Sequence, residues 1–264
     1  MTADSSVSQS VPEITQSSPD ANRTLQVRFK SEAGRLLLLL PPGQESDETA
    51  AESDWADLWQ QLKQRLDAGE RFWQPNTAVY LVARDRLLDG RQVQMIVDVL
   101  AETQLRLKRI YTSRRQTAVA AVTAGYSVEQ QLPVAHLNQA PAESGQALAE
   151  PLYLQTTVRS GVEIRHPGTI AIVGDVNPGG SAIADGDILV WGRLRGLAHA
   201  GASGNSRCRI MALQMEPTQL RIANALARAP ETPPDPLSPE VAYVTSDGIR
   251  IARAVDFAKH HLSQ

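Results

Sequence analysis

The chain has 264 residues, which is enough for two domains that each bury a core. Its 26 basic and 29 acidic residues give a formal net charge of −3, so no broad basic surface for nucleic acid is expected. Cys208 is the single cysteine, which excludes an internal disulfide and any multi-cysteine metal site and fits a reducing compartment. We expect no bound metal and no cofactor.

The amino-terminal segment, residues 1–22, is rich in Ser, Thr, Gln and Pro and is expected to form a disordered tail. It lacks the basic start and the apolar core of a secretory signal. The run from Leu36 to Leu40 is far shorter than the ~20 apolar residues that a membrane helix requires, so it predicts a buried strand.

Apolar periodicity predicts a small α/β domain over residues 23–132, with a mixed sheet and helices. The expected strands cover residues 24–30, 36–40, 77–83 and 106–112, and the first two form a hairpin. Three helices are expected. The first begins with Asp54 as its cap and ends near Gly69, the second lies around residues 93–100, and the third covers 115–124. The apolar stripes of the first two helices consist of Trp55, Leu58, Trp59, Leu62, Leu66, Val93, Ile96, Val97 and Leu100.

Residues 133–151 contain Ala, Pro, Gly and polar residues without a sustained apolar stripe. We expect a linker here that lets the two halves of the chain reorient.

Glycine recurs every six residues in the stretch GTIAIVGDVNPGGSAIADGDILVWG, at Gly168, Gly174, Gly180, Gly186 and Gly192. Two positions after each glycine there is a small or branched apolar residue, and this second series extends in both directions. Its members are Val158, Ile164, Ile170, Val176, Ala182, Ile188, Leu194 and Ala200. The repeat predicts a right-handed parallel β-helix over residues 152–229, with the apolar residues inside and glycine at the corners.

The Gly-Asp and Pro-Gly pairs are also compatible with ordinary hairpin turns in a β-sandwich. Sandwich turns recur at about eight to twelve residues with variable loops, whereas the two series here stay in step over several repeats, which favours the β-helix. Asp175, Asp185 and Asp187 are expected to cap turns, because the nine-residue repeat that binds calcium is absent.

The outer surface of a short β-helix must be covered wherever it is strongly apolar. Trp191, Met211, Leu213 and Met215 are expected to point outward, so we predict a two-fold homodimer through the β-helix. The remaining segment, 230–264, is a Pro-rich stretch followed by two short strands and a helix. Its strands are expected to add to the edge of the β-helix.

A family resemblance rests on four stretches in this order: VRSG from Val158, GDVNPGG, ADGDILVWGRLRGLAHAGASGN, and PTQLRIA from Pro217. They closely resemble the carboxy-terminal domain of the septum site-determining protein MinC family. The amino-terminal half is similar to the MinC inhibitory domain in its pattern of strands and helices. Together the resemblance covers most of residues 23–229.

The resemblance implies a non-enzymatic inhibitor of cell division. In this family the carboxy-terminal domain dimerises and binds MinD, a membrane-associated ATPase, and the amino-terminal domain antagonises assembly of the division polymer FtsZ. The MinD-binding motif maps onto Arg159, Ser160 and Gly161, but Val162 stands where the family usually has glutamine. The resemblance therefore implies a cytoplasmic protein that reaches the inner face of the membrane only through MinD.

Two other functions fit a six-residue repeat. Acyltransferases of this fold use a histidine as general base, for which His199 would be the candidate, although neither it nor His166 has a partner carboxylate recognisable in the sequence. A structural scaffold that polymerises through the ends of its β-helices is the second alternative. Oligomeric state separates the enzyme, which would be a trimer, from a dimeric MinC-like protein.

Overall fold

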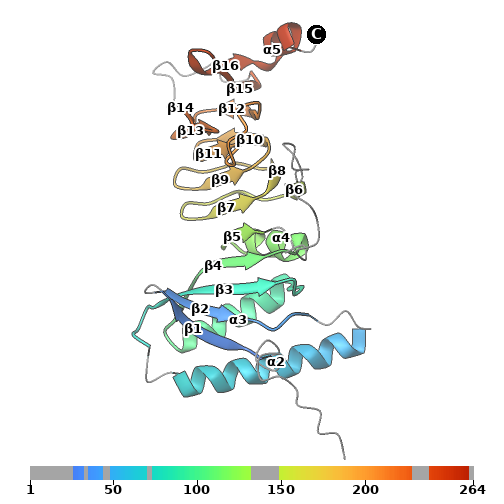
Figure 1. Ribbon diagram of the computed structural model, residues 1–264, viewed down its shortest axis with the longest axis vertical. Coiled ribbons are helices and arrows are strands. Elements are labelled where there is room, and N and C mark those ends of the chain that lie inside the picture. The colour runs from blue at the N-terminus through green and yellow to red at the C-terminus, as the bar shows by residue number, and fades with distance from the viewer. Residues whose placement is uncertain are drawn as a thin grey trace, which may run out of the picture.

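The computed structural model describes residues 26–32, 35–43, 48–69, 73–131, 149–227 and 238–261. The chain forms an elongated stack, with the amino-terminal half at one end and the carboxy-terminal helix at the other (Figure 1). The expected tail, 1–22, and residues 133–148 of the expected linker lie outside the described residues. Within the described ranges, every helix is too short or too polar to cross a bilayer.

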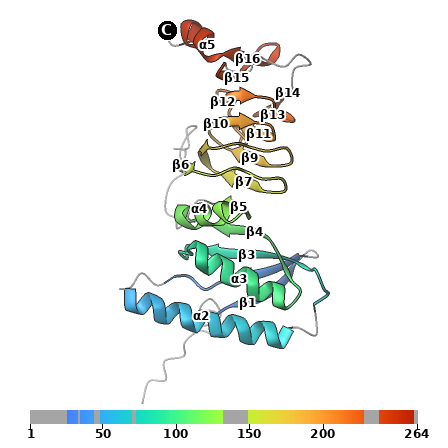
Figure 2. The same ribbon diagram turned by 180° about the vertical axis from the view of Figure 1, so that it is seen from behind.

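The amino-terminal half is a mixed sheet with helices, as the periodicity predicted. Its elements are β1 (Arg28–Glu32), β2 (Arg35–Leu39), α2 (Glu48–Gly69), β3 (Ala78–Arg84), α3 (Gly90–Glu102), β4 (Arg106–Thr112), α4 (Arg115–Thr123) and β5 (Ser127–Gln130). Strands β1 and β2 are antiparallel, and β2, β3, β4 and β5 pair in parallel in that order. Helix α3 crosses behind β3 in Figure 1 and in front of it in the reverse view of Figure 2.

Two helices in this half differ in detail from the expectation. Helix α2 begins at Glu48, six residues before Asp54, because the preceding Ala and Glu residues are strong helix formers. Its stripe of Leu58, Leu62 and Leu66 is buried as predicted. Helix α3 begins after Asp89, whose carboxylate accepts a hydrogen bond from the Gln92 amide at 2.7 Å in a capping box.

The carboxy-terminal half consists of short strands. The chain visits three sides of a stack in a fixed order, one strand or bridge on each side. Its elements are β6 (Ala149–Leu154), β7 (Glu163–His166), β8 (Gly168–Val173), β9 (Ser181–Ala184), β10 (Ile188–Leu194), β11 (Leu197–Ala200), β12 (Ile210–Met215), β13 (Gln219–Ile222), β14 (Ala225–Ala227), β15 (Glu240–Thr245), β16 (Gly248–Arg253) and α5 (Ala254–His261). We refer to residues 149–227 as the coil region.

Parallel pairing joins the coil region into three stacks. One stack contains β6, β8, β10 and β12, and a second contains β7, β9, β11 and β13. The third is a line of parallel bridges between Val158, Val176 and Leu194, so that one full turn takes 18 residues, or three repeats of six. All eight residues of the predicted inward series are at most 1% exposed, which confirms that prediction.

The repeated glycines are required mainly by close approach between successive turns of the chain. A Cβ at Gly192 would overlap the carbonyl oxygen of Gly174, and one at Gly168 would overlap that of Ala149. Of the five repeat glycines, Gly174 has a positive φ, at +145°. Gly168 and Gly192 lie within strands rather than at corners. A backbone conformation that favours glycine therefore accounts for one of the five positions, and the expectation that all five lie at corners is wrong for Gly168 and Gly192.

The last coils are covered by antiparallel strands. Strand β14 pairs with β13, and β15 pairs with β12 and continues through a tight turn into β16. Helix α5 packs on this hairpin through Phe257, whose ring lies 5.1 Å from that of Tyr243. The prediction that the strands after residue 230 extend the edge of the coil region is confirmed, because β15 adds to the free edge of β12 in antiparallel pairing.

The two halves of the chain share one sheet. Strand β5 pairs in parallel with β7 at Val128 with Ile164 and at Glu129 with Arg165, which produces a ten-stranded sheet from β1 to β14. The sequence analysis expected the halves to be separate units that reorient about a linker. The structure differs because β5, which was not predicted, offers a free parallel edge to the first coil.

Candidate partner-binding surfaces

The motif Arg159-Ser160-Gly161 forms an exposed turn between the Val158 bridge and β7. The Val162 amide donates to the Arg159 carbonyl at 3.1 Å, which closes the turn. Gly161 has φ +82° with open space around its Cα, so its backbone conformation, rather than crowding, requires glycine. The Arg159 guanidinium is presented to solvent, and a partner can therefore approach it directly.

A second turn lies directly beside the first in the next coil. The Gly180 amide donates to the Asn177 carbonyl at 2.9 Å, and Gly179 has φ +81°. A Cβ at Gly179 would meet the Ser160 hydroxyl oxygen at 2.5 Å, so the glycine leaves the space that Ser160 occupies. The two turns therefore form one continuous polar ridge along the stack.

Val162, the departure from the family motif, does not lie on this ridge. Its side chain is only 6% exposed and packs with the apolar core. An amide at this position would enter a largely apolar environment, where its polar atoms would need hydrogen-bond partners. Valine is therefore compatible with the turn, and the exposed part of the motif is limited to Arg159, Ser160 and Gly161.

An apolar groove runs along the outward side of β8, β10 and β12. It has a volume of about 360 Å³, and the β15 strand and the start of α5 form one wall. Trp191 is 68% exposed and Tyr153 is 45% exposed, although both are large side chains with substantial apolar surface. The outward side chains that line the groove include Tyr153, Ala171, Val173, Leu189, Trp191, Met211 and Leu213.

Met215 was expected to belong to this surface, and that expectation is wrong. The register between β10 and β12 shifts after Val190, so that Leu194 lies opposite Met215. Because Leu194 points inward, Met215 points inward with it and is fully buried. A bulge of this kind reverses the side on which the following residues lie. Trp191, by contrast, points outward as expected.

Two of the three aspartates beside the corners accept hydrogen bonds from backbone amides, although these amides do not belong to their own turns as predicted. Asp175 accepts a hydrogen bond from the Arg193 amide and Asp187 accepts one from the Arg209 amide, both at 2.8 Å. Each carboxylate thus reaches the following coil rather than its own turn. The described residues contain no cluster of three or more His, Cys, Asp or Glu side chains arranged for a metal ion.

The two histidines of the coil region contact backbone carbonyls rather than carboxylates. His199 Nε2 lies 3.1 Å from the Ala223 carbonyl, and His166 Nε2 lies 3.0 Å from that of Glu150. Burial lowers the pKa of both rings. A catalytic base needs an orienting partner and access to a substrate proton, and this geometry gives the acyltransferase alternative no support.

The titration of His166 predicts a pH dependence of stability. Burial holds its pKa below the ordinary value of 6.5, against the opposing hydrogen bond to Glu150. The unfolded chain therefore binds this proton at higher pH than the native one, so stability is lost as the pH falls below about 6.5. Replacing His166→Gln is expected to flatten this part of the profile in urea unfolding between about pH 5 and 8. An unchanged profile would assign the pH dependence to other groups.

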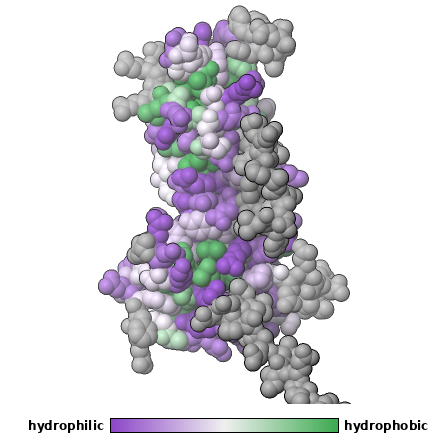
Figure 3. Space-filling view, in the orientation of Figure 1, coloured by the Kyte–Doolittle hydropathy of each residue, from purple (hydrophilic) through white to green (hydrophobic). Residues whose placement is uncertain are grey.

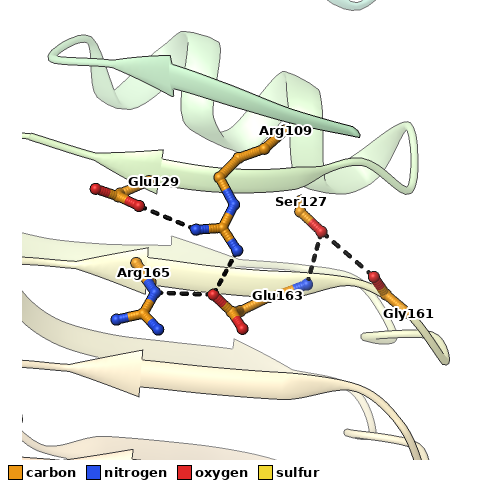
Figure 4. Close-up of polar contacts among 6 residues, drawn as sticks. All are labelled: Arg109, Ser127, Glu129, Gly161, Glu163 and Arg165. Atoms are coloured by element: carbon orange, nitrogen blue, oxygen red, sulfur yellow. Dashed lines mark hydrogen bonds and ion pairs between the residues drawn. The ribbon is translucent and has the colours of Figure 1, made fainter. Parts of the chain in front are cut away.

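A polar cluster that the sequence analysis missed lies where the two halves meet (Figure 4). Arg109 of β4 binds Glu129 of β5 at 3.0 Å and Glu163 of β7 at 2.6 Å, and Arg165 binds Glu163 at 2.8 Å. Burial alone would raise the pKa of Glu163, but the hydrogen bond from Arg165 and the charge of Arg109 lower it. Figure 3 shows polar surface at this level, between apolar regions on the amino-terminal sheet and on the upper coils.

No local sequence signal identified this cluster. Its members come from three strands, and Arg109 and Glu163 are 54 residues apart in the chain. Only the pairing of β5 with β7 brings them together.

Comparison with known proteins identifies relatives that match most of this chain. Residues 152–254 match the family described as septum formation inhibitor MinC, C-terminal domain, which includes β15 and β16 and extends beyond the expected boundary at 229. A relative from Nostoc sp., named probable septum site-determining protein MinC, is 60% identical over 91% of this chain and 65% of its own length. This chain therefore spans just under two thirds of that relative.

Two further relatives with the same name are covered over most of their length. The protein from Gloeobacter violaceus is 51% identical over 89% of this chain and 81% of its own, and that from Thermosynechococcus vestitus is 49% identical over 96% and 90%. A solved structure titled MinC:MinD cell division protein complex, from Aquifex aeolicus, contains a chain that is 36% identical. It covers 44% of this chain and 98% of its own length, with a TM-score of 0.38.

Proposed function

Because this chain belongs to the MinC family of septum site-determining proteins, we propose that it is a non-enzymatic inhibitor of misplaced division septa. In this proposal the amino-terminal half, residues 23–132, antagonises FtsZ assembly. The coil region binds MinD and dimerises. The observation that carries the proposal is the exposed Arg159-Ser160-Gly161 turn, since it presents the family's MinD-binding residues on a rigid support.

The geometry of the turn supports binding of an acidic or carbonyl-rich surface on MinD. Arg159 supplies up to five N–H donors in a planar fork, and a charge-assisted hydrogen bond is about twice as strong as a neutral one. Ser160 adds a hydroxyl beside it, and Gly179 in the next coil leaves room for that hydroxyl. The hydrogen-bonded turn limits the conformational entropy that binding would cost.

The apolar groove supports dimerisation. Trp191, Tyr153 and Leu189 together expose apolar surface of a kind that monomeric proteins rarely leave uncovered. A two-fold axis would place the same groove of two copies face to face, so that each Trp191 packs against the partner copy. We therefore propose that the homodimer forms through the outward side of β8, β10 and β12.

We also infer that the three strand stacks wind as a right-handed parallel β-helix. The 18-residue turn supports three faces of six residues each, and parallel crossovers in proteins are almost always right-handed. At the first coil β5 pairs with β7, and at the last coils β14 pairs with β13 and β15 pairs with β12. Growth by stacking coil on coil through these edges would require the paired strands to be displaced, which argues against such a scaffold.

The mechanism follows from display at a surface rather than from covalent chemistry. A dimer carries two inhibitory halves, and MinD would bring both to the inner face of the membrane. Recruitment raises their effective concentration near FtsZ filaments, so avidity can replace tight single contacts. In this mechanism the protein is cytoplasmic and reaches the membrane only through MinD.

Cosedimentation with MinD, ATP and lipid vesicles tests the proposal. The wild type is expected to pellet with vesicles only when MinD and ATP are both present. Arg159→Ala is expected to weaken this recruitment about tenfold or more, since one charge-assisted hydrogen bond is worth about 1.5–3 kcal/mol. Ser160→Ala should weaken it less.

Arg207→Ala is the matched control for these variants, because Arg207 is an exposed arginine on the loop between β11 and β12. It should sediment as the wild type does. Recruitment that ignores ATP, or that is equal for Arg159→Ala and the wild type, would contradict the assignment of the turn.

A further inference from the structure

The hydroxyl of Ser127 links the amino-terminal sheet to the candidate MinD-binding turn. Ser127 belongs to β5 and is only 8% exposed. Its oxygen accepts a hydrogen bond from the Glu163 amide at 3.0 Å, and the hydroxyl donates to the Gly161 carbonyl at 3.3 Å (Figure 4). One side chain from the other half of the protein thus holds the backbone at the end of the turn.

Charges on the same strands hold the two halves together around this link. Arg109 bridges Glu129 in its own sheet and Glu163 in the first coil, and Arg165 binds Glu163 from the other side. The Arg109 side chain is 21% exposed and both carboxylates are 28% exposed, so solvent screens these pairs less than it screens surface pairs. Removal of Arg109 would leave two acidic groups without their shared partner.

Polar side chains also connect the two halves at the other side of the contact between β5 and β7. His166 of β7 lies 3.2 Å from the Gln130 side chain of β5, and Arg115 of α4 lies 3.7 Å from the Glu150 carboxylate of β6. The β5–β7 ladder itself consists of two residue pairs. Docking therefore rests on the packing of Val128 against Ile164, which belong to one continuous apolar core, together with the polar side-chain contacts at the margins rather than on a long ladder.

From this arrangement we infer that docking of β5 on β7 and binding of MinD at the Arg159–Gly161 turn are coupled, with the docked form the binding-competent one. The inference rests on the proposed function of the turn. All three residues of the turn remain exposed in the docked form, so docking leaves the site open. Docking also fixes the Gly161 carbonyl and the Glu163 amide, which orders the turn before MinD arrives.

The coupling is reciprocal. If docking strengthens MinD binding, MinD binding must strengthen docking by the same factor. Recruitment to the membrane would then hold the inhibitory half in one orientation relative to the coil region. In this inference, the strand that pairs with the edge of β7 is β5 of the same chain.

Interdomain distances in the full chain test the docking step. Cys208 is replaced by Ala, and spin labels are attached through Arg91→Cys and Arg207→Cys, at exposed positions on the two halves. Labelled chains are diluted with unlabelled protein so that distances within one chain dominate. A narrow distribution is expected for this background, and a broad one after Arg109→Glu. The double variant Arg109→Glu with Glu163→Arg should recover part of the narrow distribution.

The matched control is Lys30→Glu, which reverses one charge of the exposed Lys30–Glu32 pair on β1, away from the contact. It should leave the distance distribution unchanged. A broad distribution in the labelled background would overturn the docking inference.

MinD affinity of the same proteins tests the coupling step. Ser127→Ala keeps Arg109 in place and is expected to lower MinD affinity about three- to tenfold, the range that a lost neutral hydrogen bond produces. Arg109→Glu should lower it at least as much. Unchanged or higher affinity in Arg109→Glu, together with a broadened distribution, would overturn the coupling. A narrow distribution in a protein that does not bind MinD would instead contradict the proposed function, and the coupling with it.

Discussion

Replacing Trp191→Glu is expected to dissociate the proposed homodimer, with the dissociation constant raised about a thousandfold. Trp191 is 68% exposed and projects beside the groove formed by β8, β10 and β12. A buried tryptophan at an interface typically contributes about 2 kcal/mol or more, and two-fold symmetry makes each substitution act twice. About 4 kcal/mol corresponds to a thousandfold change in the equilibrium.

Sedimentation velocity across a concentration series measures this change. Leu87→Glu is the matched control, since Leu87 is an exposed apolar side chain, 55% accessible, in the amino-terminal half and outside the groove. The control is expected to remain dimeric at concentrations where Trp191→Glu is monomeric. A dimer that survives Trp191→Glu at low micromolar concentration would mean that the copies meet on another surface.

The dimer matters for inhibition as well as for assembly. A monomeric Trp191→Glu protein would still carry its Arg159–Gly161 turn, so MinD binding at a single site should persist. Its recruitment to vesicles should nevertheless weaken, because two linked sites bind a surface far more tightly than one. The groove and the turn therefore make separable contributions to membrane recruitment.

The strands of the coil region could be predicted from the sequence because its apolar residues and glycines recur with a fixed period. A residue that points inward every six positions must be small or branched in every turn, and the eight predicted positions are all buried. The glycines marked the same period, although close approach of neighbouring coils, as at Gly192, explains them better than backbone angles do. Met215 could not be placed, because a single register shift between β10 and β12, after Val190, reverses the alternation.

The contact between the two halves could not be predicted from local patterns. Strand β5 is four residues long and contains one apolar residue, Val128, so it carries no recognisable alternation. Its partner β7 is 36 residues further along, beyond a segment with the composition of a linker. Arg109 and Glu163 are ordinary charged residues on strands until that pairing brings them together, and the candidate docking site is therefore a property of the tertiary structure.

Asp54 illustrates the same limit and leads to the second large effect. The sequence indicated a helix cap, but α2 begins earlier, and the Asp54 carboxylate lies 2.6 Å from the Arg86 guanidinium. Arg86 is 4% exposed, and it also donates to the carbonyls of Pro41 and Pro42 at 2.9 and 3.0 Å. One buried cation therefore ties the segment after β2 to α2.

Replacing Asp54→Leu is expected to destabilise the amino-terminal half by about 3–5 kcal/mol, because the Arg86 charge stays buried without its counterion. Urea unfolding measures the loss. The double variant Asp54→Leu with Arg86→Met should recover most of it, since an apolar pair of similar volume needs no counterion. Arg253→Met, which breaks the exposed Arg253–Asp256 pair, should cost less than about 1 kcal/mol. If Asp54→Leu alone unfolds at the wild-type urea concentration, the two proline carbonyls are sufficient partners for Arg86, and the ion pair is not what holds α2 in place.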